Sequence, residues 1–251
     1  MKEKIRYLIG KKSFHVAMVI ILVVTILFVL GLIVLRYSVE GETNMPFNLA
    51  KIVLISSSEG MDKESVESKW AFDINQNNDI YLYIEKNENY NKQEVIKSIL
   101  IDNIQVQKEE GKGEICFYRP NSSETGGIFK NITDNLIQSI EYTGAMESNI
   151  KDLKISNQGG LIAFRYATNK IAEYISNDEE INHNELLKKS NVTEEEIKGK
   201  ITFDLTIKLE SGKEYKSTLS FNMPVEGLLE NGTVSKEITD TKDIIFKRTK
   251  N

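Results

Sequence analysis

A long apolar segment near the amino terminus constrains this chain more than any other feature. The 23 residues from Ser13 to Leu35 contain no Asp, Glu, Lys or Arg. A helix of this length reaches about 34 Å, and the hydrocarbon core of a bilayer is about 30 Å thick. The segment is apolar on all sides rather than along one stripe, which favours burial in lipid. We therefore expect a transmembrane helix over residues 16–36.

Three other interpretations of this segment are less consistent with its sequence. A cleaved signal peptide has an apolar region of about 7 to 15 residues that ends in a small-residue cleavage site. Here the run is longer, and no Ala-x-Ala pattern follows Leu35. Type IV pilins need a Gly-Phe processing site, but Gly10 is followed by Lys11. The rest of the chain is not apolar enough to surround a core helix, so we favour an uncleaved signal anchor.

The charges on the two sides of the apolar segment differ in sign. The first 15 residues contain five basic residues and one acidic residue, a net charge of +4. The rest of the chain contains 27 basic and 36 acidic residues, a net charge of -9. The positive-inside rule then predicts a short cytoplasmic tail over residues 1–15 and an exported carboxyl-terminal part. The expected partner of the helix is the bilayer, and the acidic exported part argues against binding of nucleic acid.

The number of cysteines indicates what kind of cell surface the exported part belongs to. Cys116 is the single cysteine, so no intramolecular disulfide can form. A secreted eukaryotic domain would more often contain disulfides. The abundance of Lys, Asn and Ile also resembles proteins of low-GC Gram-positive bacteria, whose surface proteins commonly lack cysteine. We expect a cell-envelope protein of such a bacterium.

The exported part has the pattern of an all-β domain. Residues 37–48 are polar, contain Pro46 and predict a linker, and residues 49–251 predict an acidic β-rich domain. Short β-branched or aromatic runs alternate there with Asn, Asp, Gly and Ser, which is typical of a β-sandwich or jelly roll. The predicted strands are Lys51–Ser57, Trp70–Ile74, Ile80–Glu85, Ile96–Val106, Glu114–Arg119, Leu153–Ser156, Leu161–Tyr166, Ile171–Ile175, Ile201–Leu209, Tyr215–Met223 and Ile244–Lys247.

Two segments depart from the β pattern and predict short helices. Phe129–Tyr142 has apolar residues at helical spacing, and Asn184–Lys198 contains a capping box of Thr193 and Glu196. The domain is long enough for one large sandwich or two tandem ones, with a candidate seam at 147–151. No linker rich in Pro, Gly or Ser marks this seam, so we favour one contiguous unit.

The register of one hairpin follows from the odd or even positions of its apolar residues. The large apolar residues of Ile201–Leu209 and Tyr215–Phe221 stand at odd positions, and directly opposed residues share a face of a sheet. A three-residue loop that ends at Gly212 satisfies this condition and places glycine where a G1 bulge needs a left-handed residue. The predicted pairs include Ile207 with Tyr215 and Lys208 with Glu214.

One candidate calcium site has the oxygen spacing of the first half of an EF-hand loop. Its residues are Asp73, Asn75, Asn77 and Asp79. Asn78 replaces the glycine of such a loop, and its twelfth position is not Glu. We therefore favour a β-hairpin turn between the strands predicted at 70–74 and 80–84. The acidic loop at 178–185 is a weaker calcium candidate.

The chain shows no recognisable catalytic signature. It has two histidines, His15 at the membrane edge and His183 in the acidic loop, which is too few for a histidine-rich zinc site. Gly-x-Ser-x-Gly, His-Glu-x-x-His and P-loop motifs are absent. Cys116 alternates with apolar neighbours in a predicted strand and is interpreted as a packing residue. We expect no cofactor and no catalytic residue, although a pair of carboxylates for glycoside hydrolysis remains open.

These features predict a single-pass envelope protein whose exported β domain has a binding, structural or accessory role. The expected partners outside the membrane are an envelope protein or a cell-wall glycan. The alternatives are an extracytoplasmic hydrolase on a jelly-roll scaffold and an accessory subunit of an envelope complex.

Overall fold

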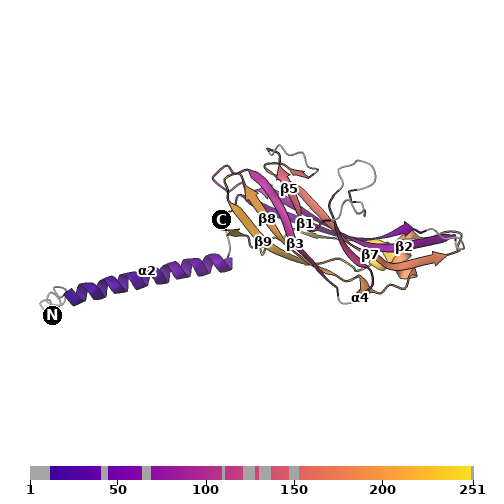
Figure 1. Cartoon of the computed structure of the whole chain (residues 1–251), viewed down its shortest axis with the longest axis horizontal. Helices are drawn as coiled ribbons and strands as arrows, with labels where there is room; N and C mark the ends of the chain where they lie inside the picture. The colour runs from indigo at the N-terminus through magenta and orange to yellow at the C-terminus, as the bar shows by residue number, and fades with distance from the viewer. Residues whose placement is uncertain are drawn as a thin grey trace. The chain divides into compact units, whose positions relative to one another are not determined.

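The computed structural model describes residues 12–40, 45–63, 69–108, 111–120, 128–129, 137–146 and 153–249. The chain divides into two units, Met1–Thr43 and Asn44–Asn251. The first contains helix α2 (Lys12–Glu40), and the second is built mainly of strands (Figure 1). The predicted linker at 37–48 therefore overlaps the end of α2, and Phe47 already begins the first strand.

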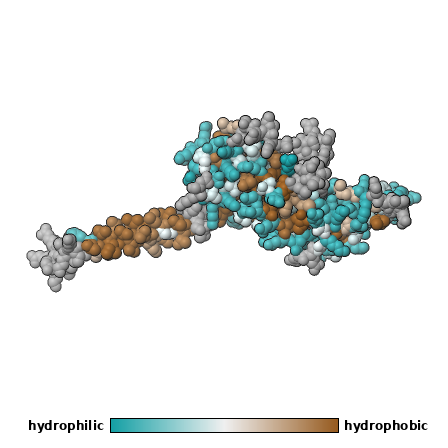
Figure 2. All heavy atoms as spheres, in the orientation of Figure 1, coloured by the Kyte–Doolittle hydropathy of each residue, from teal (hydrophilic) through white to brown (hydrophobic). Residues whose placement is uncertain are grey.

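Helix α2 carries the apolar segment. Its window His15–Leu35 has a mean hydropathy of 3.4, and none of it is buried. The side chains from Val16 to Leu35 form the continuous apolar surface in Figure 2. The helix is thus long and apolar enough to cross a membrane. Length and composition alone fit a signal sequence as well.

The second unit confirms the prediction of a mostly β domain. It contains two sheets, and strands make up 53% of the structure against 18% helix. The strand order is β10-β1-β2-β7-β4 in one sheet and β11-β9-β8-β3-β5-β6 in the other, with only β5 and β6 pairing in parallel among the described residues. The strands are β1 Phe47–Asp62, β2 Trp70–Lys86, β3 Ile96–Gln107, β4 Glu114–Tyr118, β5 Ile140–Gly144, β6 Lys154–Ile155, β7 Gly159–Ser176, β8 Lys200–Leu209, β9 Glu214–Asn222, β10 Thr233–Ile238 and β11 Lys247–Thr249.

A large apolar core contains residues from both sheets. The rings of Phe164 on β7 and Phe203 on β8 meet edge to face, with centroids 5.0 Å apart. The hydroxyl of Tyr142 on β5 donates a hydrogen bond to the carbonyl oxygen of Ala163 on β7 at 2.6 Å. Strand β8 contributes its odd-numbered residues, all of them buried, as the alternation in the sequence predicts.

A smaller second core lies toward the other end of β2 and β7, which continue past β3 and β8 (Figure 1). Phe72 and Tyr174 from these strands pack with Leu186 and Leu228 from the helical segments. These segments are the 3₁₀ helix η2 (His183–Glu185) and the helices α3 (Leu186–Lys189), α4 (Glu194–Ile197) and α5 (Leu228–Asn231). The predicted capping box is present at the start of α4, but two short helices replace the single one expected at 184–198.

The turn predicted at the Asp73 segment is wrong. Strand β2 runs without interruption from Trp70 to Lys86 and pairs with β1 and β7 along this length. The predicted strands at 161–166 and 171–175 are likewise parts of one strand, β7. Several polar side chains of β2 bond to neighbouring strands, as Asp79 does to Arg165 on β7, and the strand pairing overrides their local preference for turns.

The helix predicted at Phe129–Tyr142 is also wrong where the structure describes it. Phe129 forms an isolated bridge with Pro120, and Ile140–Gly144 is strand β5, paired with β3. Pairing with β3 buries Ile140 and Tyr142 on one face. Residues 130–136 of the predicted helix and the candidate seam at 147–151 lie outside the described residues.

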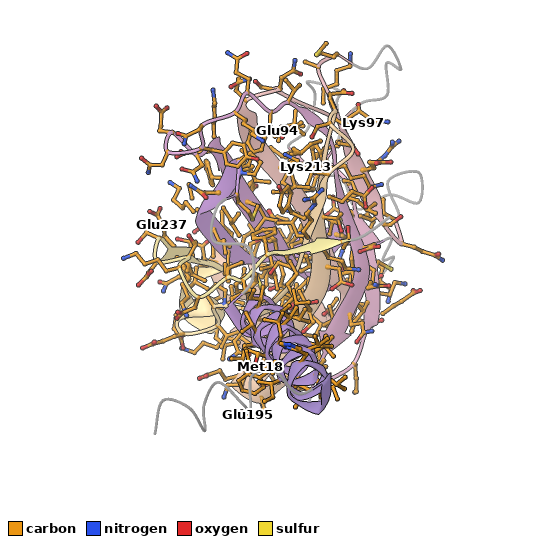
Figure 3. All side chains as sticks on the ribbon, turned by 90° about the vertical axis from the view of Figure 1, so that its left-hand side faces the viewer. Met18, Glu94, Lys97, Glu195, Lys213 and Glu237 are labelled. Atoms are coloured by element: carbon orange, nitrogen blue, oxygen red, sulfur yellow. The ribbon has the colours of Figure 1, made fainter. Side chains whose placement is uncertain are left out.

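The predicted register of the β8–β9 hairpin is confirmed. Ile207 pairs with Tyr215 and Lys208 with Glu214, and Gly212 has a φ of +79°. The amide of Gly212 donates to the carbonyl of Leu209 at 3.0 Å and closes the loop. The next residue, Lys213, forms an ion pair with Glu94 that ties the hairpin to the segment before β3 (Figure 3).

Replacing Gly212 with valine should destabilise the domain by about 1–2 kcal/mol, because a β-branched residue is strained at positive φ. A Cβ at this position would meet no atom within 4 Å, so the expected cost comes from the backbone rather than from a clash. Gly212→Asn is the matched control and should lower the free energy of unfolding by less, since Asn tolerates positive φ. Equal unfolding free energies for Gly212→Val and the parent in urea denaturation would contradict the assignment.

Candidate functional site

The structure spreads the four calcium candidates along strand β2. Asp73 and Asp79 are six residues apart on an extended strand, a separation of about 20 Å at about 3.3 Å per residue. Asp73 lies 3.2 Å from the ammonium of Lys170, and the side-chain oxygen of Asn75 accepts a hydrogen bond from the Lys170 amide at 2.9 Å. The four side chains therefore do not converge on one cation.

Asp79 forms a buried ion pair with Arg165 on β7. The guanidinium binds both carboxylate oxygens, and the contact of Nη2 with Oδ2 is 3.0 Å. The exposed fraction of each side chain is close to 10%. Burial raises the pKa of Asp79, while the neighbouring Arg165 opposes this shift. The Phe129 ring lies 5.0 Å from the guanidinium, so the geometry is that of a structural pair.

The weaker calcium candidate at 178–185 is also engaged in structure. The indole nitrogen of Trp70 donates a hydrogen bond to the backbone carbonyl oxygen of Asp178 at 3.0 Å. The ammonium of Lys69 donates one to the backbone carbonyl oxygen of Glu179 at 3.2 Å. The His183 ring meets Phe72 edge to face, at 5.7 Å between centroids. Within the described ranges, no three His, Cys, Asp or Glu residues gather closely enough to hold a metal ion.

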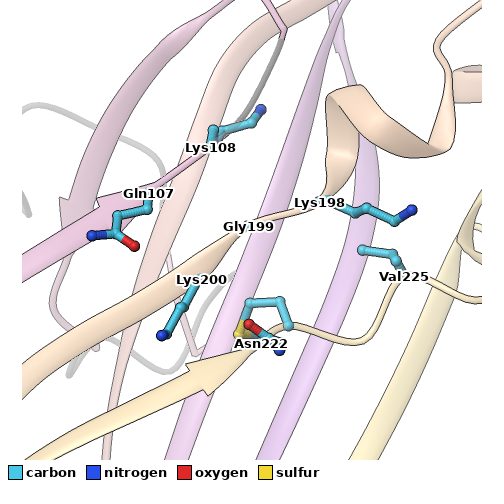
Figure 4. Close-up of a pocket in the computed structure, with 8 residues that line it drawn as sticks. Gln107, Lys108, Lys198, Gly199, Lys200, Asn222 and Val225 are labelled. Carbon is cyan, nitrogen blue, oxygen red and sulfur yellow. The ribbon is translucent and has the colours of Figure 1, made fainter.

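A cavity that sequence reasoning missed lies where the large core meets the smaller one. Its volume is about 420 Å³, and three segments form it: the end of β3, the entry to β8 and the exit from β9 (Figure 4). Gln107, Lys200 and Asn222 are cross-strand neighbours at this end of the sheet. The other described lining residues are Lys108, Lys198, Gly199, Met223 and Val225.

Gly199 lets the chain pass close to the large core. A Cβ at this position would lie 2.7 Å from the hydroxyl oxygen of the buried Tyr166. The carbonyl of Gly199 accepts a hydrogen bond from the Met223 amide at 3.0 Å, which joins the entry of β8 to the exit of β9. Lys198 and Lys200 flank the glycine, and their side chains leave this segment in different directions (Figure 4).

Lys108 is a half-buried cation in this lining. Burial lowers the pKa of Lys108, and the charge of Glu196 partly opposes that shift. The ammonium lies 3.4 Å from the hydroxyl oxygen of Thr168, and no carboxylate in the described part of the chain lies within 4.0 Å of it. Its charged form is therefore partly desolvated without a close anionic partner.

The nearby carboxylates belong to helix α4 rather than to the described lining. Lys198 contacts Glu194 and Glu195 at 3.4 Å each. Glu196 binds the backbone amide of Thr193 in the capping box. The described lining thus contains three lysines and no acidic residue, although acidic residues outnumber basic ones 36 to 27 after position 15.

Replacing Arg165 with methionine should destabilise the domain by about 3–5 kcal/mol, because it leaves the Asp79 carboxylate buried without its cation. Lys188→Met is the control, since Lys188 and Glu230 form an exposed pair at 3.6 Å and its loss should cost less than about 1 kcal/mol. Urea denaturation of the full chain in detergent, followed by the fluorescence of Trp70, measures both. Equal costs for the two variants would show that the buried pair is not structural.

The described residues therefore include a half-open cavity whose described lining contains three lysines. Its volume falls within the range of about 300–1,000 Å³ that small-molecule sites occupy. No family model, no curated protein and no solved structure matches the chain. A functional assignment for this domain rests on the geometry of the cavity and on the apolar helix.

Proposed function

We propose that this chain is a single-pass membrane protein with its amino terminus in the cytoplasm and its β domain outside. The observation that carries the proposal is the apolar, unburied segment His15–Leu35 next to a tail of net charge +4. The cost of moving such a tail across the membrane favours its retention on the cytoplasmic side. The exported unit then begins near Asn44.

The exported unit in this proposal is a β-sandwich with an added smaller core. The shared core of the two sheets and the contact between Phe164 and Phe203 support face-to-face packing. The sandwich provides a rigid frame for the cavity, because the cavity lining is placed by the ends of paired strands. Side chains on such a frame are held more precisely than side chains on long loops.

The role of this domain in the proposal is binding rather than catalysis. The best-placed carboxylate, Asp79, is held by Arg165, and the described cavity lining contains cations and amides without a nucleophile paired to a base. The absence of such a pair from the described lining favours retention of a ligand over its chemical conversion. The bound partner is a component of the cell envelope, either a protein or a cell-wall glycan.

Fusion of a reporter enzyme after Asn251 tests the topology. An alkaline phosphatase reporter, which is active only outside the cytoplasm, should be active, and a cytoplasmic reporter at the same site should be inactive. Intact-mass measurement of the membrane-extracted protein should also find the amino-terminal segment attached. A mature protein that begins after Leu35 would contradict the anchor, and an active cytoplasmic reporter would contradict the orientation.

A further inference from the structure

We propose that the open edge of strand β9 binds an extended segment of a partner protein as an added antiparallel strand. The open edge is the side of residues 217–221 that faces away from β8. This inference rests on the proposed binding role and names the class of partner and the surface that receives it. Its basis is a row of backbone groups without a partner among the described residues and a groove that runs beside them.

The backbone groups of β9 point alternately to β8 and to the open edge. The amide of Leu209 donates a hydrogen bond to the carbonyl of Lys213 at 2.9 Å. The amide of Met223 donates one to the carbonyl of Gly199 at 3.0 Å. Both pairs continue the register of the β8–β9 hairpin, and hydrogen-bonded pairs alternate with non-bonded pairs in an antiparallel ladder. The odd-numbered residues of β9 therefore bond to β8, and the even-numbered residues direct their N–H and C=O groups to the other edge.

Strand β11 covers only the beginning of this edge. It pairs with residues 214–216 of β9 and with no later residue. The next even-numbered residues are Thr218 and Ser220, and no described residue hydrogen-bonds to their backbone amides or carbonyls. The same register would bring Ile245 opposite Thr218, but β11 begins only at Lys247. A row of unpaired donors and acceptors of this kind is a template for a further strand.

A groove of about 660 Å³ lies along the open edge. Its lining includes the consecutive residues 216–221, so side chains from both faces of β9 border it and it opens on the backbone edge. Residues 243–245 also line the groove, and Ile245 among them is 40% exposed. The following residue, Phe246, is buried in the large core. A single extended chain fits between these residues and β9 better than the edge of a second sheet, which needs room for its own neighbouring strand.

The open edge lacks the features by which proteins protect exposed edges from pairing. Charged side chains, proline and very short strands are common forms of protection. Among the other described edges, β10 carries Lys236 and Glu237, β4 leads into Pro120, and β6 has two residues. Residues 217–221 contain no charged residue, proline or glycine. We infer that a partner covers this edge rather than that it remains open.

The alternation along β9 sets the side chains of the added strand. Directly opposed residues share a face of a sheet. Leu219 is buried and Phe221 packs against the large core, whereas Thr218 and Ser220 are exposed. The partner residues opposite Leu219 and Phe221 should therefore be apolar, and those opposite Thr218 and Ser220 should be polar. In an antiparallel pair, these polar residues also exchange the backbone hydrogen bonds with β9.

Hydrogen exchange of the full chain in nanodiscs of a zwitterionic lipid tests the proposal. The probe is the end-blocked peptide Lys-Thr-Val-Thr-Val-Thr-Lys, which alternates polar and apolar residues. The amides of Leu219 and Phe221 face β8 and are the protected internal reference. Saturating peptide should slow exchange at Thr218 and Ser220 about 100-fold and leave the reference unchanged. Half-saturation should occur at or below about 1 mM.

Two N-methylated forms of the peptide separate strand addition from other modes of binding. Methylation of two Thr amides removes donors that face β9 and should abolish the protection of Thr218 and Ser220. Methylation of the two Val amides, which point away from β9, adds the same groups and should change the affinity by less than about threefold. Equal loss of protection with both forms, or equal retention, would overturn the proposal.

A variant of the protein tests the same bond from the other side. Ser220→Pro removes an N–H that points away from β8, a position where edge strands tolerate proline. It should weaken peptide binding at least about tenfold while the amide of Leu219 stays protected. Ser220→Thr keeps the N–H and is the matched control, so it should bind the peptide as the parent does. Binding by Ser220→Pro that equals the parent would contradict the proposal, and the methylated peptides decide the question if this variant does not fold.

The remaining outcomes separate this inference from the proposed function. Failure of the unmodified peptide to protect Thr218 and Ser220 would overturn the added strand, while the topology of the chain and a binding role at the cavity would stand. Protection that appears without peptide and rises with protein concentration would show that a second copy of the chain covers the edge. The partner protein would then be wrong.

Discussion

The pairing of β2 with β7 is the interaction on which the rest of the β domain depends. The ladder runs from Trp70 opposite Ser176 to Glu85 opposite Gly159, with an irregularity between Ile74 and Gln76. Both strands contribute to the large core and to the smaller one. Their middle part is polar but buried, and the side chain of Gln76 donates a hydrogen bond to the carbonyl of Ile197, outside the pair, at 2.8 Å. This polar layer therefore joins the two cores.

The cavity is a consequence of the same arrangement. The second sheet ends near Gln107, Lys200 and Asn222, whereas β2 and β7 continue to the smaller core. The chain has to cross from one core to the other at this point, and Gly199 permits a close crossing over Tyr166. Lys108 is half-buried at this junction, and its ammonium lies 3.4 Å from the hydroxyl oxygen of Thr168.

The sequence predicted those features that depend on neighbouring residues. The parity of the β8 and β9 side chains fixed the hairpin register, and the spacing of Thr193 and Glu196 located the cap of α4. Predictions failed where distant partners decide the structure. Asn and Asp in the middle of β2 favour a turn locally, but Arg165 and other cross-strand partners hold them in a strand. The cavity was missed because Lys108 and the segment around Gly199 are far apart in the sequence.

Titration of the Lys108 ammonium by NMR in the full chain tests the nature of the cavity most directly. Burial should place the pKa of Lys108 below the ordinary value of 10.5, although the charge of Glu196 opposes part of this shift. A pKa at or above 10.5 in the ligand-free protein would contradict this picture. Such a value would mean that the ammonium is fully hydrated or already paired with a carboxylate.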